Sequence, residues 1–371
     1  MCRSLIVRSV SLGSFRNYAA LELEPSPGLN LIVGRNAQGK SNLLEAIAML
    51  GTGKSFRTAR EAEVVQRGQS LAFVSGVADL ARGRIALSCR VALTGGIARK
   101  TYAVNGAPVR YAKFLGSIKV VTFVPADLHL VSGAPSLRRA MLNATLSQER
   151  ATYYADLARY TKHAAQKSAY LRTAPQPDRQ LLGTYNALLA DLAARLLLVR
   201  GRYVTQLAQA AAAVHRRWLP GGALLGLAYR PSPAVDLPDE ATLRTQIHAA
   251  LEEAMPRELA RRQCLVGPHR DDVELTLGGQ PLAQYGSQGQ QRTAVLALKA
   301  AEYAVVRERT GEAPVLLLDD VLSELDGQRQ EAFLGSVEGY EQAFVTATAL
   351  PGLQIGSAHY VVEGARLSRI R

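Results

Sequence analysis

Cysteine is scarce in this chain of 371 residues: Cys2, Cys89 and Cys264 lie far apart and form no CxxC pair. This pattern excludes a disulfide framework and favours a reducing compartment. No run of 18 apolar residues occurs, and residues 1–18 lack the apolar stretch and small-residue cleavage site of a signal peptide. We therefore expect a cytoplasmic protein with no membrane span and no membrane partner.

Negative charge is missing from one long stretch of the chain. Residues 81–126 hold eight Lys/Arg and no Asp or Glu, and residues 131–217 hold thirteen Lys/Arg against four acids. The formal net charge of the whole chain is +13. Many charge runs are only solvated faces, but positive charge concentrated in this way favours a polyanionic partner, most simply nucleic acid.

The hydrophobic pattern divides the chain into strand-rich ends and a helical middle. Alternating or short apolar runs predict strands, and apolar residues at helical spacing predict helices. Strands are predicted at 3–12, 19–24, 29–34, within 70–124, at 315–320 and at 342–348, and helices at 41–50, within 136–217, at 240–262 and at 288–309. We predict an α/β protein in which residues 1–130 and 262–371 form one lobe and residues 131–261 form an inserted, mainly helical lobe without a long coiled coil.

A glycine-rich loop follows the predicted strand 29–34. Residues 34–41 match G-x-x-x-x-G-K-[ST] and precede a predicted helix. In this pattern the glycines let backbone N–H groups point at a β-phosphate, the lysine adds charge for the β/γ oxygens, and the serine hydroxyl ligates Mg²⁺. The sequence therefore predicts an ATP and Mg²⁺ site, with Lys40 also acting in catalysis. The predicted nucleotide-binding residues are Gly34, Arg35, Asn36, Ala37, Gln38, Gly39, Lys40, Ser41 and Asn42.

Two carboxylates end the apolar run at residues 315–320, VLLLDD. A buried strand of this kind places one carboxylate beside Mg²⁺, which the P-loop serine also holds. We assign that role to Asp319, so that Ser41 and Asp319 form the predicted metal site. Asp320, the next residue, is predicted to polarise the attacking water. An acidic strand end alone is often an ordinary turn, but together with the P-loop it predicts two catalytic carboxylates.

A second anion-binding element is predicted where SQGQQ (287–291) opens a helix about 30 residues before Asp319. Ser287 and the backbone N–H groups from Gly289 to Gln290 lie at the helix start, where the helix dipole favours negative charge. A serine-capped helix start is common, so the motif gains weight only from its order and spacing with the P-loop and the acidic strand end.

These motifs resemble the RecF/SMC branch of the ABC ATPases, and most closely the RecF family. GPHRDD before SQGQQRT is the most specific pair, because transporter ATPases and SMC proteins do not share it in that form. The matching segments are FRNY (15–18), GRNAQGKSN (34–42), GKSFR (53–57), VGPHRDD (266–272), SQGQQRT (287–293) and LLLDDVLSELD (316–326).

The resemblance implies an ABC-ATPase-like head, with a P-loop lobe that carries an antiparallel β subdomain. It implies that Ser287, Gly289 and Gln290 cap the γ-phosphate held by a second subunit, and that residues 323–326 cross the same interface, so that ATP binding produces a homodimer. RecF-like proteins bind double-stranded and gapped DNA, act with RecR and RecO to load RecA in repair and replication, and hydrolyse ATP weakly under DNA stimulation. Most ABC ATPases carry Glu where this chain has Asp320, and this shorter acid predicts slow hydrolysis.

Two further positions are placed by the resemblance. Asp127 stands at the Q-loop position of other ABC ATPases, which predicts a γ-phosphate sensor that contributes to the metal site. In the helical lobe, Asn143 stands where RecF-like chains carry an acid, and Gln166–Ser168 departs from their Gln-Arg-Asn pattern. These departures lie in the inserted lobe and leave the nucleotide motifs unaffected.

Several single residues leave alternatives open. Tyr18 and Arg16 could contact adenine, although a Tyr after a strand is more often a core residue. Arg57 could contact ATP or DNA. His269 could lie near the nucleotide or brace the signature helix predicted at 288–309, and Trp218 could stack on a base or pack in the core.

Two other functions remain open from the sequence. The nucleotide-binding subunit of a transporter would share the P-loop, but its signature would not lie about 246 residues after Ser41. A nuclease coupled to an ABC ATPase would need a separate acidic cluster, which the sequence does not offer. DNA binding without a membrane partner, and DNA degradation with a divalent metal, discriminate these functions.

Overall fold

The computed structural model describes residues 5–321, 340–348 and 357–370, together with positions 327, 330, 333 and 335. The chain groups into two compact units, residues 1–128 with 296–371 and residues 129–295. The first boundary lies close to the predicted one at 130, whereas the return to the first unit comes later than residue 262. Residues 272–277 pair with a strand at 225–230, which keeps them in the second unit. The assignment of 131–261 as a separate lobe stays a prediction.

The first unit contains two six-stranded sheets. One is antiparallel, in the order β2-β1-β4-β5-β6-β7, and the other runs β15-β14-β3-β13-β12-β8. The strands of the first sheet are β1 (Ile6–Phe15), β2 (Tyr18–Leu23), β4 (Leu71–Leu80), β5 (Gly83–Thr94), β6 (Ile97–Val104) and β7 (Ala107–Val109). Those of the second are β3 (Gly28–Val33), β8 (Val120–Phe123), β12 (Val315–Asp319), β13 (Gln342–Ala347), β14 (Ser357–Glu363) and β15 (Arg366–Arg369).

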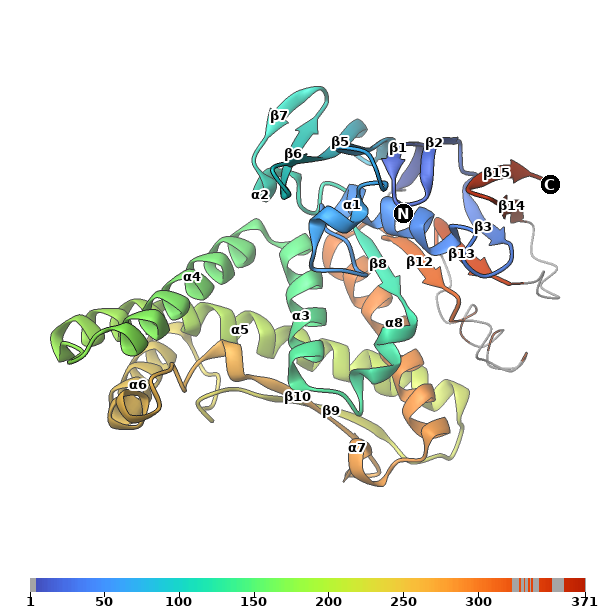
Figure 1. Ribbon diagram of the computed structural model, residues 1–371. Coiled ribbons are helices and arrows are strands. Elements are labelled where there is room, and N and C mark those ends of the chain that lie inside the picture. Colours follow the sequence, from blue (N-terminus) through green and yellow to red (C-terminus); the bar gives the residue numbers. More distant parts are fainter. Residues whose placement is uncertain are drawn as a thin grey trace. The chain divides into compact units, whose positions relative to one another are not determined.

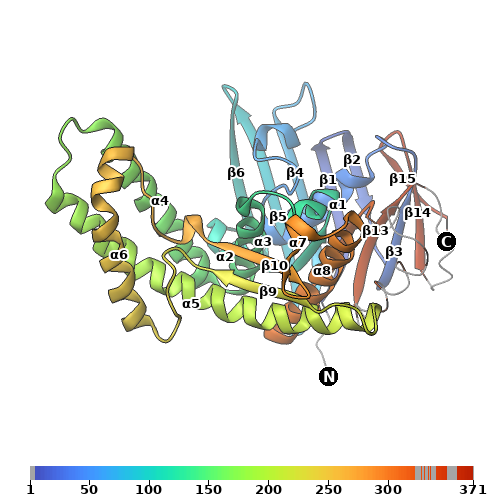
Figure 2. The same ribbon diagram turned by 90° about the horizontal axis from the view of Figure 1, so that it is seen from below.

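Helix α1 (Lys40–Thr52) packs against strands of both sheets, as Figures 1 and 2 show. Its apolar residues, among them Leu43, Leu44 and Ile47, join one core with the inward side chains of β1, β4 and β5. This packing fixes the helix that follows the predicted P-loop. This unit also includes a 3-10 helix at Glu61–Val64, α2 (Tyr111–Phe114), a 3-10 helix that begins at Pro125, and residues 296–310 of α8 (Gln288–Thr310).

The second unit consists mainly of long helices with a small sheet, β11-β10-β9. Its central helix, α5, packs against α4, α6 and β9, and Figure 2 shows it running along the sheet. Its elements are α3 (Pro135–Glu149), α4 (Ala151–Thr173), α5 (Arg179–Trp218), β9 (Leu225–Arg230), α6 (Glu240–Arg261), a 3-10 helix at Pro268–Arg270, β10 (Asp272–Leu277), β11 (Gln280–Pro281), α7 (Leu282–Tyr285) and the start of α8.

Buried charges hold these helices together. Lys167 of α4 and Glu258 of α6 form a 2.5 Å ion pair, and Asn186 of α5 accepts a second hydrogen bond from Lys167. α5 is apolar enough by composition to cross a membrane. Its buried Asn186 and Arg200 instead bond to neighbouring parts of the same unit, as expected for a core helix.

The GPHRDD segment forms the second buried centre of this unit. Asp271 is fully buried and accepts hydrogen bonds from Arg200 at 2.6 Å, from the Ser232 amide at 2.8 Å and from the Tyr229 hydroxyl. The amide oxygen of Asn143 accepts from Arg200 at 2.9 Å. The departure at position 143 therefore keeps a hydrogen-bond acceptor for Arg200 and removes only the negative charge.

Candidate nucleotide site

The predicted nucleotide motifs lie at one edge of the second sheet. Strands β3, β13, β12 and β8 are parallel, so their carboxyl ends share that edge. Val33 pairs with Ala347, and Asp319 pairs with Thr346. The P-loop follows Val33 and the turn toward Asp127 follows β8, so the sheet brings the P-loop, the acidic strand end and Asp127 to the crevice side where α/β proteins bind ligands.

The P-loop requires glycine at its two predicted positions. A Cβ at Gly39 would lie 2.8 Å from the Asn17 amide nitrogen and 2.9 Å from the Tyr18 hydroxyl. A Cβ at Gly34 would lie 2.4 Å from the carbonyl oxygen of Val362. Asn17, Tyr18 and Val362 therefore pack closely against one side of the loop backbone. The opposite side of the loop is left for an anion.

Lys40 lies over the loop that precedes it. The residue is 6% exposed, and its ammonium group donates to the carbonyl oxygens of Gly34 at 2.6 Å and Arg35 at 3.0 Å. Arg35, Asn36 and Ala37 are exposed at the loop tip. Among the described residues, the Lys40 ammonium group bonds to neutral carbonyls. Its charge is therefore available to a phosphate, and the arrangement fits a nucleoside triphosphate.

The other P-loop residues are held by a chain of amides. Gln38 accepts from the Gly364 amide at 2.6 Å, and its carbonyl accepts from Asn17 at 3.0 Å. Asn42 in turn donates to Asn17 at 2.7 Å. Ser41 is half-buried in the first turn of α1. The FRNY segment thus supports the loop, a role that the sequence did not reveal.

Asp319 is oriented by a residue that the sequence analysis missed. Its carboxylate accepts a 2.9 Å hydrogen bond from the Thr346 hydroxyl, which itself accepts from the Asp320 amide at 2.8 Å. Asp319 is 6% exposed, whereas Asp320 is half-buried with a φ of 53°. Thr346 is a polar residue within the buried strand β13, and that contrast is the one signal that could have identified it.

Asp127 lies near a buried ion pair. Its carboxylate accepts from the Val124 amide at 2.9 Å. Burial raises the pKa of Asp127 above its usual value, and the charge of Lys299 opposes that rise. Lys299 is itself buried and paired with Glu302. The charges of α8 therefore act on Asp127 at the shared strand edge, while its metal and γ-phosphate roles stay predictions.

Ser287 forms a reciprocal cap at the start of α8. Its hydroxyl accepts from the Gln290 amide at 3.3 Å, and the Gln290 side chain accepts from the Ser287 amide at 2.8 Å, as in a capping box. Ser287, Gly289 and Gln290 are exposed. A Cβ at Gly289 would meet nothing within 4 Å. This chain's own packing does not require glycine there, and the helix start is open to a ligand. Residues 323–326, which the resemblance places across the same interface, lie outside the described residues.

Glu45 is a further buried carboxylate that the sequence analysis missed. It lies on α1 and accepts two hydrogen bonds from Arg16, at 2.6 and 2.9 Å, and one from Ser55. Arg57 lies 3.7 Å away and also donates to Asn42. Two arginines therefore share one carboxylate beside the P-loop helix. A lone Glu in the apolar run LLEAIAML was the available signal.

Tyr18 and His269 resolve two of the open alternatives. Tyr18 is fully buried and donates to the Gly39 carbonyl at 3.1 Å, so it belongs to the core and not to an adenine contact. Within the second unit His269 bonds to the Tyr160 hydroxyl at 2.7 Å, and burial lowers the pKa of His269. His269 therefore has a structural role, bonded to α4 and to the Cys264 carbonyl, and its bracing of the helix that begins at Gln288 stays a prediction.

Comparison with known proteins agrees with this geometry. Residues 6–363 match the RecF/RecN/SMC N terminal domain family. The chain is 38% identical over 363 residues to the DNA replication and repair protein RecF of Limosilactobacillus fermentum, with 96% of each chain covered. It is 40% identical to RecF of Symbiobacterium thermophilum, covering 95% of this chain and 93% of the relative.

The chain belongs to the RecF family. Solved structures of the recombination mediator protein RecF in the RecFOR pathway, RecF-ATPrS and RecF-ATP, superpose with TM-scores of 0.92 and 0.91 at 31% identity. Each comparison covers 99% of this chain and 98% of the other. An SMC head bound to the C-winged helix domain of ScpA has a TM-score of 0.53 at 14% identity, with 98% and 96% covered, a likeness of fold alone. The expected α/β head of the ABC ATPase type is thereby confirmed.

Proposed function

We propose that this chain is an ATP-dependent DNA-binding protein of recombinational and replication-gap repair in the cytoplasm. One observation carries the proposal. At the shared carboxyl ends of the parallel strands, a P-loop whose packing requires glycine meets Lys40 and Asp319, and the Thr346 hydroxyl orients the Asp319 carboxylate. Two solved RecF structures of the same fold are described with ATP or ATPrS, which supports ATP as the ligand of this edge.

ATP would bind along the P-loop, with Lys40 turning from its own carbonyls to the β/γ-phosphates. Ser41 and Asp319 would hold Mg²⁺, which neutralises phosphate charge when bound. Thr346 keeps the Asp319 carboxylate in place. Asp320 is the candidate to orient water, and its short side chain favours slow turnover, with ATP acting as a switch.

The complete site needs a second chain in this proposal. The exposed cap of Ser287 and the open space at Gly289 would let the start of α8 approach the γ-phosphate bound by a partner, giving a homodimer on ATP binding. DNA, double-stranded or gapped, would contact the basic segments 81–126 and 131–217 through phosphates. RecR and RecO would be its partners in loading RecA.

Sedimentation with ATP and Mg²⁺ tests the dimer. The wild type should dimerise, Lys40→Arg should dimerise less, and Ser287→Arg should bind ATP yet remain monomeric. Ser287→Ala is the matched control. It removes the helix cap, which costs about 1 kcal/mol of stability, but it adds no bulk at the helix start. A Ser287→Arg dimer of wild-type affinity would contradict the shared site. Failure of the wild type to bind any DNA, with or without ATP, would contradict the function itself.

A further inference from the structure

The outer face of the antiparallel sheet carries side chains that the nucleotide site does not use. Strands β4, β5 and β6 send alternate residues into the core around α1 and the others to solvent. The outward set includes three exposed apolar residues, Leu71, Phe73 and Ile97, at 45%, 38% and 67% exposure. It also includes the exposed Arg90 and Arg99. This face is therefore both apolar and basic.

Phe73 is placed by a glycine on the neighbouring strand. Phe73 pairs with Gly13 of β1 on one side and with Arg90 of β5 on the other. A Cβ at Gly13 would lie 2.0 Å from the Phe73 ring. The ring therefore fills the space over Gly13, and this support holds an aromatic ring at the surface of the sheet.

The two arginines lie diagonally on adjacent strands. Arg90 pairs with Thr101, and Ala92 pairs with Arg99, a diagonal relation that spans about 7–8 Å. Within the part of the chain that the structure describes, neither arginine has an ion-pair partner. Arg84, on the same strand and face as Arg90, is bound to Asp79 at 2.8 Å. Two unpaired cations so close together repel each other and favour an anion between or above them.

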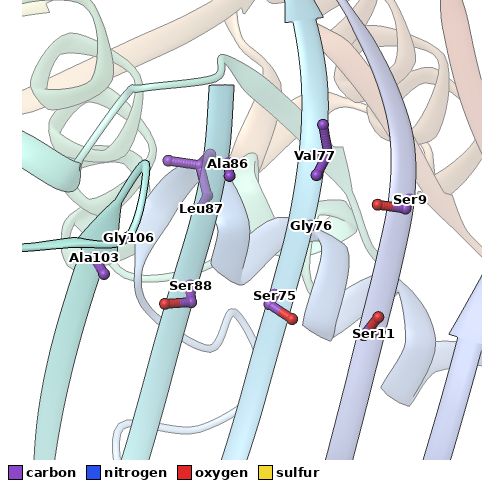
Figure 3. Close-up of a pocket in the computed structure, with 10 residues that line it drawn as sticks. All are labelled: Ser9, Ser11, Ser75, Gly76, Val77, Ala86, Leu87, Ser88, Ala103 and Gly106. Atoms are coloured by element: carbon purple, nitrogen blue, oxygen red, sulfur yellow. The ribbon is translucent and has the colours of Figure 1, made fainter. Parts of the chain in front are cut away.

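A shallow hollow lined by hydroxyl groups adjoins this patch. Figure 3 shows Ser9 and Ser11 on β1, Ser75 on β4 and Ser88 on β5 around it, and its volume is about 260 Å³. Ser11, Ser75 and Ser88 form one cross-strand row. Small side chains keep the floor low, and serine hydroxyls donate readily to phosphate oxygens. Glu22 ends that row beyond Ser11, so the anion-binding end is on the β5 and β6 side.

We propose that this face binds a single-stranded segment of nucleic acid, with phosphates on Arg90 and Arg99 and a base stacked on Phe73. Basic grooves with surface aromatics are how proteins hold single strands, because every base has a π-face. A duplex would offer phosphates to the arginines but no free base to Phe73, so the aromatic ring favours the single strand. An acidic protein would complement the arginine charges, but it would offer no phosphate oxygens to the serine hydroxyls. The inference rests on the proposed DNA function and assigns the single-strand arm of a junction to this sheet.

Fluorescence anisotropy with ATP and Mg²⁺ tests the assignment on three labelled probes: a blunt duplex, the same duplex with an oligo-dT tail, and oligo-dT alone. Phe73→Leu keeps apolar bulk and should weaken binding of oligo-dT and of the tail roughly tenfold. Phe73→Tyr should restore it. Arg90→Gln with Arg99→Gln should lower the slope of log K against log salt for oligo-dT by about 1.4. Arg84→Gln is the matched control. Because Arg84 is already paired with Asp79, this variant should lower the slope less than the double variant does.

Binding of the blunt duplex should change less than binding of the tailed duplex in all these variants, because the other cations of residues 81–126 and 131–217 still offer charge to duplex phosphates. If Phe73→Leu and the double arginine variant bind the tailed duplex like the wild type, the single-strand site is wrong. Equal losses on blunt and tailed duplexes would make the face a duplex site and would also overturn the proposal. A wild type that binds blunt duplex with no gain from a tail contradicts this inference alone, whereas a wild type that binds no probe contradicts the proposed function.

Discussion

The two compact units bury charged side chains in different places. In the unit formed by residues 1–128 and 296–371, Lys40, Glu45 and Asp319 are buried around the P-loop and the strand edge beside it. In residues 129–295 the buried charges lie between helices and loops, as in the pairs Lys167–Glu258 and Arg200–Asp271. Lys40, Glu45 and Asp319 of the first unit surround the candidate nucleotide site, whereas the buried pairs of the second unit fix how its elements pack. Removing one partner should therefore have different consequences in the two units.

The largest effect is expected from Asp271→Ala. Arg200 would keep its bonds to Tyr153, Asn143 and the Pro268 carbonyl but lose its buried counter-charge. We expect the free energy of unfolding of residues 129–295 to fall by about 3–5 kcal/mol. Urea denaturation followed by the fluorescence of Trp218, the single tryptophan of the chain, measures it. Asp271→Asn, which keeps an acceptor for Ser232, should lose less. A loss below about 1 kcal/mol in Asp271→Ala would break the comparison.

Glu45→Ala is the matching change in the first unit. It leaves Arg16, whose side chain is 16% exposed, without its carboxylate, and should cost about 2–3 kcal/mol. Because Glu45 also holds Ser55 and faces Arg57 beside the P-loop, the affinity for ATP should fall as well. Titration with a fluorescent ATP analogue and thermal unfolding measure both effects, and Glu45→Gln is the conservative control. Normal ATP affinity in Glu45→Ala would show that this buried charge serves packing alone.

The smallest effect concerns pH and the second unit. Burial lowers the pKa of His269 in the folded chain, so the unfolded chain takes up a proton first as the pH falls below about 6.5. The stability contributed by neutral His269 is therefore present above about pH 6.5. It is lost as the pH falls through the lower pKa that His269 has in the folded chain. His269→Gln should flatten the pH dependence of unfolding by at most about 1.4 kcal/mol per pH unit. His215, whose pKa burial also lowers, should leave part of the slope. An unchanged slope would contradict a neutral, buried His269.

Local patterns predicted the elements that form the candidate nucleotide site. The P-loop was identifiable because its glycines, Lys40 and Ser41 are contiguous and sit between an apolar run and a helical one. Asp319 was identifiable because it ends a fully apolar strand. The helix starts at Glu240 and Gln288 follow equally local signals.

Contacts between distant parts of the chain could not be predicted in the same way. Arg200 and Asp271 are 71 residues apart, and Asp319 and Thr346 belong to different strands. Their pairing depends on how helices and strands pack, which no local pattern encodes. The return of the chain to the first unit after residue 295, later than predicted, also depends on a distant contact. Strand β10 pairs with β9 although the whole of α6 separates them in sequence.

Mixing two inactive variants tests the shared nucleotide site most directly. Lys40→Arg impairs the P-loop and Ser287→Arg blocks the start of α8, so a heterodimer of the two retains one composite site with both elements intact. Sedimentation of each variant alone and of the mixture, with ATP and Mg²⁺, should show little dimer in either variant and recovered dimer in the mixture. A mixture that sediments as the sum of its components, while wild type dimerises, would contradict a site built from two chains.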